Sequence, residues 1–261
     1  TKAAETVIGA GQGSEFYVTV LDGVTGAGKT EVYLDAVAET LSQGKQAVVM
    51  VPEIALTSQW LERFQRRFGA PPGEWHSDLT ASKRRATWRA VAENTISVVV
   101  GARSALFLPY PNLALIVVDE EHEQSYKQDS TPRYHGRDVA FRLAQLAACP
   151  ALLASATPSI ESWANATSRG TYRLHELTER APGLTIPRVQ LVDMAMERKH
   201  QKQGTSTAIG PSLEQALEDT LQDGGQALLL LNRRGFASYL ACRNRSCGWV
   251  LSCDQCDVTM V

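Results

Sequence analysis

Short runs of almost purely apolar residues recur along the chain and alternate with amphipathic stretches. Such runs are typical of strands that are buried on both faces, as in a parallel sheet. Between them, apolar side chains recur at helical spacing, as in the sets that begin at Val32 and Val139. The alternation of strand and helix predicts an α/β fold. The apolar runs are YVTVL (17–21), AVVMV (47–51), ISVVV (96–100), LALIVV (113–118), ALLAS (151–155) and ALLLL (227–231).

The alternating pattern breaks over residues 178–211. Proline and glycine recur there, together with the polar run ERKHQKQGTST, around one apolar segment, VQLVDM (189–194), for which a strand is predicted. This density of helix- and strand-breaking residues is typical of a linker region. We therefore place a domain boundary near Pro182, which divides the chain into the segments 1–181, 182–238 and 239–261.

The composition is that of a globular chain of one or two domains. The 261 residues are 44% hydrophobic and 21% charged, with a formal net charge of −2. This balance neither indicates nor excludes a nucleic-acid partner, because a basic track can lie on one face of an acidic protein. No apolar run approaches the roughly 20 residues that span a bilayer, and no signal-like segment opens the chain. We therefore expect a cytoplasmic protein with no membrane partner.

A glycine-rich turn follows the first apolar run directly. The sequence GVTGAGKT (23–30) fits the P-loop pattern of Gly, four residues and Gly-Lys-Ser/Thr. In this pattern backbone N–H groups and a helix N-terminus surround the phosphates, Lys29 reaches the β- and γ-phosphates, and Thr30 gives an oxygen to Mg²⁺. A turn that binds nothing is the alternative, which the position between strand and helix disfavours. The predicted ATP-binding residues here are Gly23, Thr25, Gly26, Ala27, Gly28, Lys29 and Thr30.

The run LALIVV leads into four polar residues, DEEH (119–122). At the end of a buried strand, Asp119 can hold Mg²⁺, and Glu120 beside it can deprotonate the water that attacks the γ-phosphate. An acid directly after the metal-binding aspartate favours hydrolysis over transfer to a bound acceptor. Acids that merely face solvent at a strand end are the alternative. The P-loop in the same chain favours the catalytic interpretation.

Together these residues resemble superfamily 2 helicases. DEEH fits their Asp-Glu-x-His box, which adds His122 to the catalytic set, and Ser155, Ala156 and Thr157 match the SAT motif that couples the nucleotide site to DNA movement. Longer segments look like the PriA family of replication-restart helicases, over nearly all of residues 21–256. They are GVTGAGKTEVYL (23–34), VPEIALT (51–57), GARSALF (101–107), DEEHEQSYKQ (119–128) and LLLLNRRGFA (228–237).

The resemblance also implies a track for single-stranded DNA. It assigns Pro52, Glu53 and Thr57 to that track, with Gly101, Arg103 and Ser104; by themselves the residues VPE could be a turn after a strand. The segment after DEEH interleaves aromatic and basic residues, which can stack on bases and meet phosphates. It resembles an aromatic-rich loop of related helicases, although a solvated loop before a helix is the alternative. The candidates in that segment are Tyr126, Lys127, Arg133 and Tyr134.

Four cysteines lie close together near the C-terminal end of the sequence. Cys253 and Cys256 have the two-residue spacing of a zinc knuckle, and four residues separate Cys242 from Cys247. One tetrahedral Zn²⁺ site is favoured over free or disulfide-bonded thiols. The PriA resemblance implies eight cysteines, two zinc ions and only two residues within the first pair, so this chain departs from the pattern there.

The resemblance implies a RecA-like parallel-sheet ATP-binding lobe over 1–181, a partial second lobe over 182–238 and the start of an inserted zinc-binding module over 239–261. It implies an ATP-dependent 3′-to-5′ DNA helicase, monomeric, that acts on single-stranded and forked DNA with primosome proteins and single-stranded DNA-binding protein. The arginine finger that the family supplies from its second lobe has no evident match, so we expect slow hydrolysis by this chain itself. The rival hypotheses are a P-loop ATPase or kinase of another class and a non-catalytic primosome scaffold with a vestigial nucleotide site.

Overall fold

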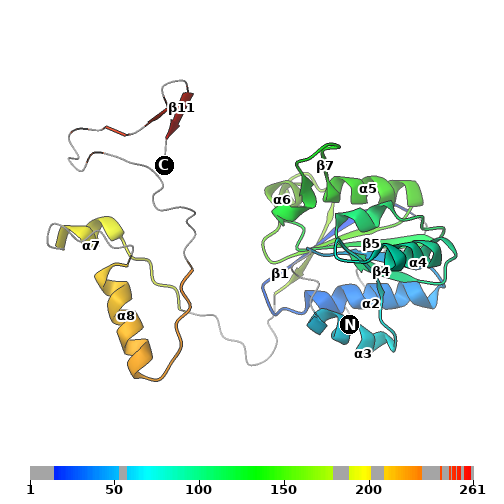
Figure 1. Cartoon of the computed structure of the whole chain (residues 1–261), viewed down its shortest axis with the longest axis horizontal. Coiled ribbons are helices and arrows are strands. Elements are labelled where there is room, and N and C mark those ends of the chain that lie inside the picture. Colours follow the sequence, from blue (N-terminus) through cyan, green and yellow to red (C-terminus); the bar gives the residue numbers. More distant parts are fainter. Residues whose placement is uncertain are drawn as a thin grey trace. The chain divides into compact units, whose positions relative to one another are not determined.

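The computed structural model describes residues 15–52, 58–178, 188–200 and 209–230, and parts of the segment 242–259. The chain divides into two compact units, Thr1–Ile186 and Pro187–Val261 (Figure 1). The boundary predicted near Pro182 falls among residues outside the described ranges. In the part of the chain that is described, no helix is long and apolar enough to cross a membrane.

A parallel sheet is the centre of the first unit. Among the described residues it has seven strands in the order β3-β4-β2-β5-β8-β1-β9, and every pairing is parallel. The five apolar runs predicted as strands between residues 17 and 155 all form inner strands, because only apolar side chains suit a sheet that is covered on both faces. The strands are β1 (Val18–Gly23), β2 (Gln46–Met50), β3 (Gly73–Trp75), β4 (Val98–Gly101), β5 (Leu113–Asp119), β8 (Ala151–Ser155) and β9 (Arg173–Leu177).

Helices cover both faces of this sheet. Figure 1 shows α2 and α3 on one face and α5 and α6 on the other. The helices are α2 (Lys29–Ser42), α3 (Ser58–Phe68), α4 (Ala81–Ala92), α5 (Gly136–Ala147) and α6 (Ile160–Thr167). Short elements follow two strand ends: the 3-10 helices η2 (Arg103–Phe107) and η3 (Gln124–Tyr126), and the antiparallel pair β6 (Lys127–Gln128) and β7 (Tyr134–His135).

Two hydrophobic cores result, one on each face of the sheet. Because side chains alternate along a strand, neighbouring residues of β2 enter different cores. Val48 packs with Ala140 and Ala144 of α5 in one core, whereas Val49 packs with Val37 of α2 in the other. This double burial fixes the register of the inner strands and thereby fixes which residues emerge at their carboxyl ends.

The second unit contains two helices and one short strand pair among its described residues. The helices are α7 (Met194–His200) and α8 (Pro211–Gln222), and α8 has proline at its start, where the missing N–H has no partner to lose. The strands β10 (Ser252–Cys253) and β11 (Cys256–Thr259) pair antiparallel. Cys253 and Cys256 therefore lie opposite each other at the turn of this pair.

Two strand predictions for this unit are wrong. Residues 188–193 and 225–230 have no regular secondary structure, and Leu191 and Leu228 are 94% and 97% exposed. A strand requires a neighbour that satisfies its backbone hydrogen bonds. Among the described residues of this unit, β10 and β11 pair only with each other, so neither apolar segment has such a neighbour.

Candidate active site

The P-loop sequence forms the turn between β1 and α2. Gly26 and Gly28 have φ angles of 83° and 88°, in the left-handed region where a side chain is strained. Gly28 caps α2, and no side chain accepts a hydrogen bond from the backbone at that cap. Since the first N–H groups of a helix and its dipole attract anions, this end of α2 fits a phosphate group. Thr25 and Gly26 lie exposed at the tip of the turn, next to Ala27.

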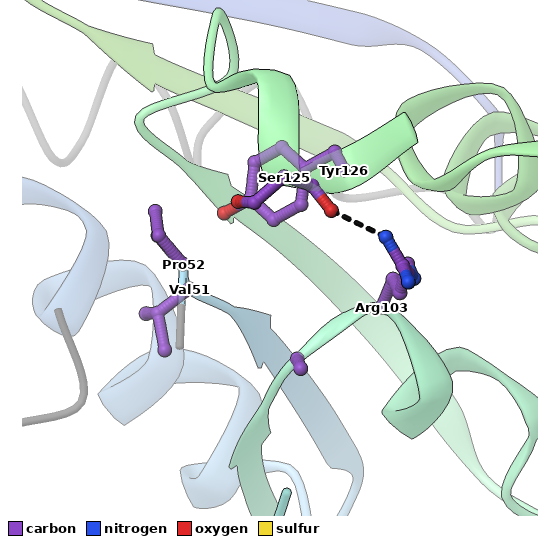
Figure 2. A pocket seen from close by; sticks show the side chains of 6 residues that line it. Val51, Pro52, Arg103, Ser125 and Tyr126 are labelled. Atoms are coloured by element: carbon purple, nitrogen blue, oxygen red, sulfur yellow. Dashed lines mark hydrogen bonds between the residues drawn. The ribbon is translucent and has the colours of Figure 1, made fainter. Parts of the chain in front are cut away.

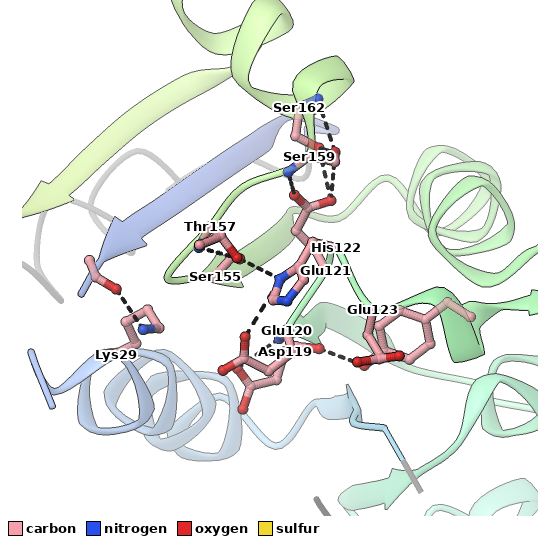
Figure 3. A network of polar contacts seen from close by, with 12 residues as sticks. Lys29, Asp119, Glu120, Glu121, His122, Glu123, Ser155, Thr157, Ser159 and Ser162 are labelled. Atoms are coloured by element: carbon pink, nitrogen blue, oxygen red, sulfur yellow. Dashed lines mark hydrogen bonds and ion pairs between the residues drawn. The ribbon is translucent and has the colours of Figure 1, made fainter. Parts of the chain in front are cut away.

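Lys29 is the first residue of α2 and is buried despite its charge. Its Nζ atom donates to the carbonyl oxygen of Gly23 at 2.6 Å and lies 3.4 Å from that of Val24. The ammonium group is thus bonded to the backbone at the start of the turn (Figure 3). A lysine held in this way lies within the same loop whose backbone would surround the phosphates.

Asp119 ends β5 at the same edge of the sheet. Its Oδ2 atom accepts a hydrogen bond from the Tyr33 hydroxyl at 2.9 Å, and its Oδ1 atom accepts one from the Glu120 N–H at 3.0 Å. Burial raises the pKa of Asp119, whereas the Tyr33 hydrogen bond and the charge of Lys29 lower it. A partly buried carboxylate with unused lone pairs, together with the hydroxyl of Thr30 at the start of α2, is a donor set that fits Mg²⁺, which prefers oxygen ligands.

Glu120 turns the chain sharply after β5. Its φ angle of 47° lies in the left-handed region, which non-glycine residues rarely adopt, and strain of this kind concentrates at functional sites. The turn leaves the Glu120 carboxylate accessible, 3.6 Å from Nδ1 of His122. The predicted base is therefore at the surface of the site rather than within the core.

The acidic box contacts the SAT motif directly. Nδ1 of His122 lies 2.8 Å from Oγ of Ser155, and the N–H of Thr157 donates to the same oxygen at 3.0 Å (Figure 3). Ser155 ends β8, the strand between β5 and β1, so the sheet order brings the two motifs together. A change in the position of His122 would therefore shift Ser155 and, with it, Ala156 and Thr157.

A buried network beside this contact was missed by the sequence reasoning. Glu121 is fully buried, and its carboxylate accepts hydrogen bonds from Arg137 Nη1 at 2.8 Å, Ser162 Oγ at 3.0 Å and the Ser159 N–H at 2.5 Å. The Ser159 hydroxyl donates as well, at 3.1 Å. The sequence did contain one indication of this network: Glu121 is the third consecutive acid after a buried strand. An acid that is buried there needs a positively charged partner.

A pocket opens beside the ends of β2 and β4. It has a volume of about 210 Å³ and is lined by Val51, Pro52, Ala102, Arg103, Ser125 and Tyr126 (Figure 2). The guanidinium of Arg103 donates to the carbonyl oxygens of Ser125 at 2.6 Å and Lys127 at 2.9 Å. Arg103 therefore joins the segment after β4 to the segment after the acidic box. Ser104 is exposed beside it, and Glu53 and Thr57 lie outside the described residues.

Two residues predicted to contact DNA are buried and have structural roles. Tyr126 is only 1% exposed, and its hydroxyl lies 2.5 Å from the carbonyl oxygen of Asp119 and 3.3 Å from that of Met50, so its ring does not offer a face to a base. Gly101 is buried, and a Cβ atom there would lie 2.1 Å from the carbonyl oxygen of Trp75. Gly101 thus permits the close approach of β3 to β4.

The three remaining candidates in the segment after η3 are accessible, whereas Pro52 at the pocket is buried. Lys127 and Arg133 are exposed, and Tyr134 is partly exposed on β7. The Tyr134 ring packs edge-on against Phe107, with 5.5 Å between the ring centroids. Phe107 is 61% exposed, which is unusual for a large aromatic side chain, and the sequence reasoning did not select it.

The four clustered cysteines lie in the second unit. The N–H of Cys242 donates to the carbonyl oxygen of Trp249 at 2.9 Å, which closes a loop that contains Cys247. Cys253 and Cys256 are partners in the register of the β10–β11 pair. Among the side chains that the structure describes, no group of three or more histidines, cysteines or acids could hold a metal ion. The side chains of Cys253 and Cys256 are not among those described.

A P-loop turn, a carboxylate at the end of β5 and an adjoining SAT motif on a parallel sheet are the features of a helicase motor lobe. The chain belongs to the DEAD/DEAH box helicase family, which it matches over residues 3–166. The predicted resemblance to PriA is confirmed by relatives named replication restart protein PriA. The chain is 44% identical over 246 residues to that of Bacillus subtilis (strain 168), and 43% identical over 249 residues to that of Synechocystis sp. (strain ATCC 27184 / PCC 6803 / Kazusa).

These matches cover 94% of this chain but only 30% and 29% of the two relatives. The chain thus spans about 30% of the length of the curated relatives that it matches. Among solved structures, RecG bound to a three-way DNA junction matches with a TM-score of 0.50 and 21% identity, over 77% of this chain and 26% of that one. At this identity the likeness concerns the fold alone, which is the predicted RecA-like α/β lobe.

Proposed function

We propose that this chain is the ATP-binding lobe of a DNA helicase that acts in replication restart. The observation that carries the proposal is the meeting of three motifs at one edge of the sheet: the P-loop with Lys29, the carboxylate of Asp119 and the contact between His122 and Ser155. Membership in the DEAD/DEAH box helicase family and the similarity to PriA support the same function.

In the proposed mechanism, the N-terminal end of α2 and Lys29 hold the triphosphate of ATP. Thr30 and Asp119 would hold Mg²⁺, which neutralises charge on the phosphates when bound. Glu120 accepts a proton from the attacking water, and its accessible carboxylate next to His122 suits that role. The slow hydrolysis expected of this chain by itself belongs to the same proposal.

The contact of His122 with Ser155 supports a route from the nucleotide site to DNA movement. A shift of His122 would move Ser155, because His122 contacts the Ser155 hydroxyl. It would also move Thr157, because the Thr157 N–H donates to the same hydroxyl oxygen. We assign the DNA-facing surface to Pro52, Arg103, Ser104, Lys127, Arg133 and Tyr134. Translocation from 3′ to 5′, forked DNA, primosome proteins, single-stranded DNA-binding protein, a monomeric state and a cytoplasmic location are proposed from the resemblance to PriA.

We also propose that Cys242, Cys247, Cys253 and Cys256 bind one Zn²⁺. The support is the backbone: Cys242 bonds to Trp249, with Cys247 between them in the sequence, and Cys253 pairs with Cys256 in the register of β10 and β11. Two short turns with paired cysteines are typical of structural zinc sites. Metal analysis of the purified chain, before and after treatment with a chelator, tests this assignment.

The decisive experiment for the proposed function is Lys29→Ala. Removal of the ammonium group should weaken binding of a fluorescent ATP analogue by more than tenfold, since a charged contact to phosphate is lost. Lys45→Ala is the matched control, because Lys45 is exposed in the connection between the far end of α2 and β2. In a complete helicase that contains this lobe, Lys29→Ala should also abolish ATPase activity that single-stranded DNA stimulates.

Two outcomes would contradict the helicase proposal. Unchanged fork restart by the Lys29→Ala variant would favour the non-catalytic scaffold with a vestigial nucleotide site. ATP hydrolysis that single-stranded DNA does not stimulate would favour a P-loop enzyme of another class.

A further inference from the structure

A buried tyrosine connects both proposed magnesium ligands to helix α3. Tyr33 lies in the second turn of α2, four residues after Lys29, and is fully buried. Its hydroxyl donates to Oδ2 of Asp119 at 2.9 Å and accepts from Nε1 of Trp60 at 3.0 Å. The side chain of Thr30 adjoins the same hydroxyl. The phenol oxygen therefore contacts side chains from the P-loop helix, from β5 and from α3.

The direction of these hydrogen bonds is fixed by chemistry. The indole N–H of Trp60 can only donate, so the Tyr33 oxygen must accept from it. The single proton of the phenol is then left for the carboxylate of Asp119. The Tyr33 hydroxyl therefore donates to Oδ2 of Asp119, while the Glu120 N–H donates to Oδ1. These two hydrogen bonds together fix the orientation of the carboxylate group.

Trp60 is itself held rigidly. Its ring stacks on Phe64 with 5.7 Å between centroids, and Phe64 is buried in the core between α3 and the sheet. Arg63 and Arg67 of α3 form ion pairs with Glu31 of α2, which hold the two helices together next to the P-loop. The orientation of Tyr33 is therefore imposed by the packing of α3 on α2.

We propose that Tyr33, supported by Trp60, is a positioning residue that orients Asp119 and Thr30 for Mg²⁺ in the nucleotide site. The inference rests on the proposed function, since it requires ATP to bind at the P-loop. Tyr33 does not contact the phosphates in this assignment. Its loss should therefore weaken the metal-dependent part of nucleotide binding and leave the metal-free part intact.

Tyr33→Phe tests this assignment, because it removes the hydroxyl and keeps the ring. A fluorescent ATP analogue is titrated into the chain in excess EDTA, and Mg²⁺ is then titrated at a fixed nucleotide concentration. We expect the Mg²⁺ concentration at half-saturation to rise about tenfold, as for one lost hydrogen bond to a carboxylate. The affinity in EDTA should change less than about twofold. Trp60→Phe should raise the Mg²⁺ requirement by a smaller factor.

Tyr110→Phe is the matched control, because Tyr110 donates to the carbonyl oxygen of Ala105 at 2.9 Å, away from the site. It should leave both titrations unchanged. An unchanged Mg²⁺ requirement in Tyr33→Phe, or equal losses with and without Mg²⁺, would overturn the inference. If Tyr33→Phe does not fold, Trp60→Phe decides by the same criteria. Failure of the wild-type chain to bind the nucleotide would instead contradict the proposed function.

Discussion

A carboxylate without solvent exposure, such as that of Glu121, is stable only where its charge and lone pairs are satisfied. The guanidinium of Arg137 supplies the charge, and Ser159 and Ser162 supply further donors. These partners come from the start of α5 and the start of α6, so one side chain joins two helices to the end of β5. The residue lies between Glu120 and His122, and its fixed position therefore also fixes theirs.

Arg137→Leu should be strongly destabilising for this reason. It leaves the Glu121 carboxylate buried without a counter-charge, which typically costs about 3–5 kcal/mol of the free energy of unfolding. Urea denaturation followed by circular dichroism measures the change. Arg142→Leu is the control on the same helix: Arg142 is exposed and donates to Gln145 of that helix, and its loss should cost less than about 0.5 kcal/mol.

The double variant Glu121→Leu/Arg137→Leu makes the test sharper. With both charges removed, much of the loss should be recovered, because no unpaired charge remains. A double variant as unstable as Arg137→Leu would show that packing, rather than the ion pair, accounts for the effect.

At the scale of the elements, helix α5 ends with an unfavourable residue. Ala148 caps it with φ 48° and ψ 47°, in the left-handed conformation for which glycine is the usual choice. Ala148→Gly should therefore stabilise the chain by about 0.5–1 kcal/mol, since the steric strain of alanine exceeds the entropy that glycine loses. The urea midpoint measures it.

Ala147→Gly is the control for this substitution one position earlier, inside the helix. There glycine should destabilise the chain by about 0.5–1 kcal/mol. Equal effects of the two variants would contradict the assignment of Ala148 as a left-handed cap.

The inner strands could be predicted from the sequence, and the edge strands could not. Strands β2, β4 and β5 are covered on both faces, so they are continuous apolar runs that stand out from their surroundings. The edge strands β3 and β9 have the sequences GEW and RLHEL, and their partial exposure permits polar residues. Conversely, the apolar run at 227–231 predicted a strand that its described residues do not form, because pairing depends on a neighbour and not on the run itself.

The same distinction holds within the site. The P-loop and DEEH are contiguous motifs, and their local sequence suffices to predict them. Tyr33 bonds to a residue 86 positions away, and Glu121 bonds to side chains 16 to 41 positions away. Such partners are set by the order of strands in the sheet, which the sequence reasoning did not derive. Tyr126 was predicted to face DNA for the same reason, because the neighbouring sequence does not reveal that its side chain is buried.

For the whole molecule, the proposed DNA surface combines aromatic and basic side chains over the carboxyl ends of the strands. Phe107, which is exposed, and Tyr134, which is partly exposed, form an edge-on pair, and Lys127 and Arg133 lie on the adjoining β6–β7 segment. An aromatic face next to cations is the usual way in which proteins hold a single strand without sequence preference. Phe107 therefore joins the residues proposed to contact DNA.

Phe107→Ala should weaken binding of a fluorescent oligothymidine by about tenfold, because one stacked base contributes about 1–3 kcal/mol. Fluorescence anisotropy at a fixed low salt concentration measures the change. Trp88→Ala is the control, since Trp88 on α4 is a similarly exposed aromatic residue, at 48%, and belongs to no proposed site. Equal losses in both variants would indicate non-specific stickiness of exposed rings.

The phenol of Tyr126 bridges the main chain at the ends of two neighbouring strands, at Met50 and Asp119, while Arg103 grips the backbone on either side of that tyrosine. A displacement of the β6–β7 segment must either move these strand ends with it or break the hydrogen bonds of Tyr126 and Arg103. A displacement of this segment would therefore reach the end of β5, where Asp119, the proposed Mg²⁺ ligand, lies.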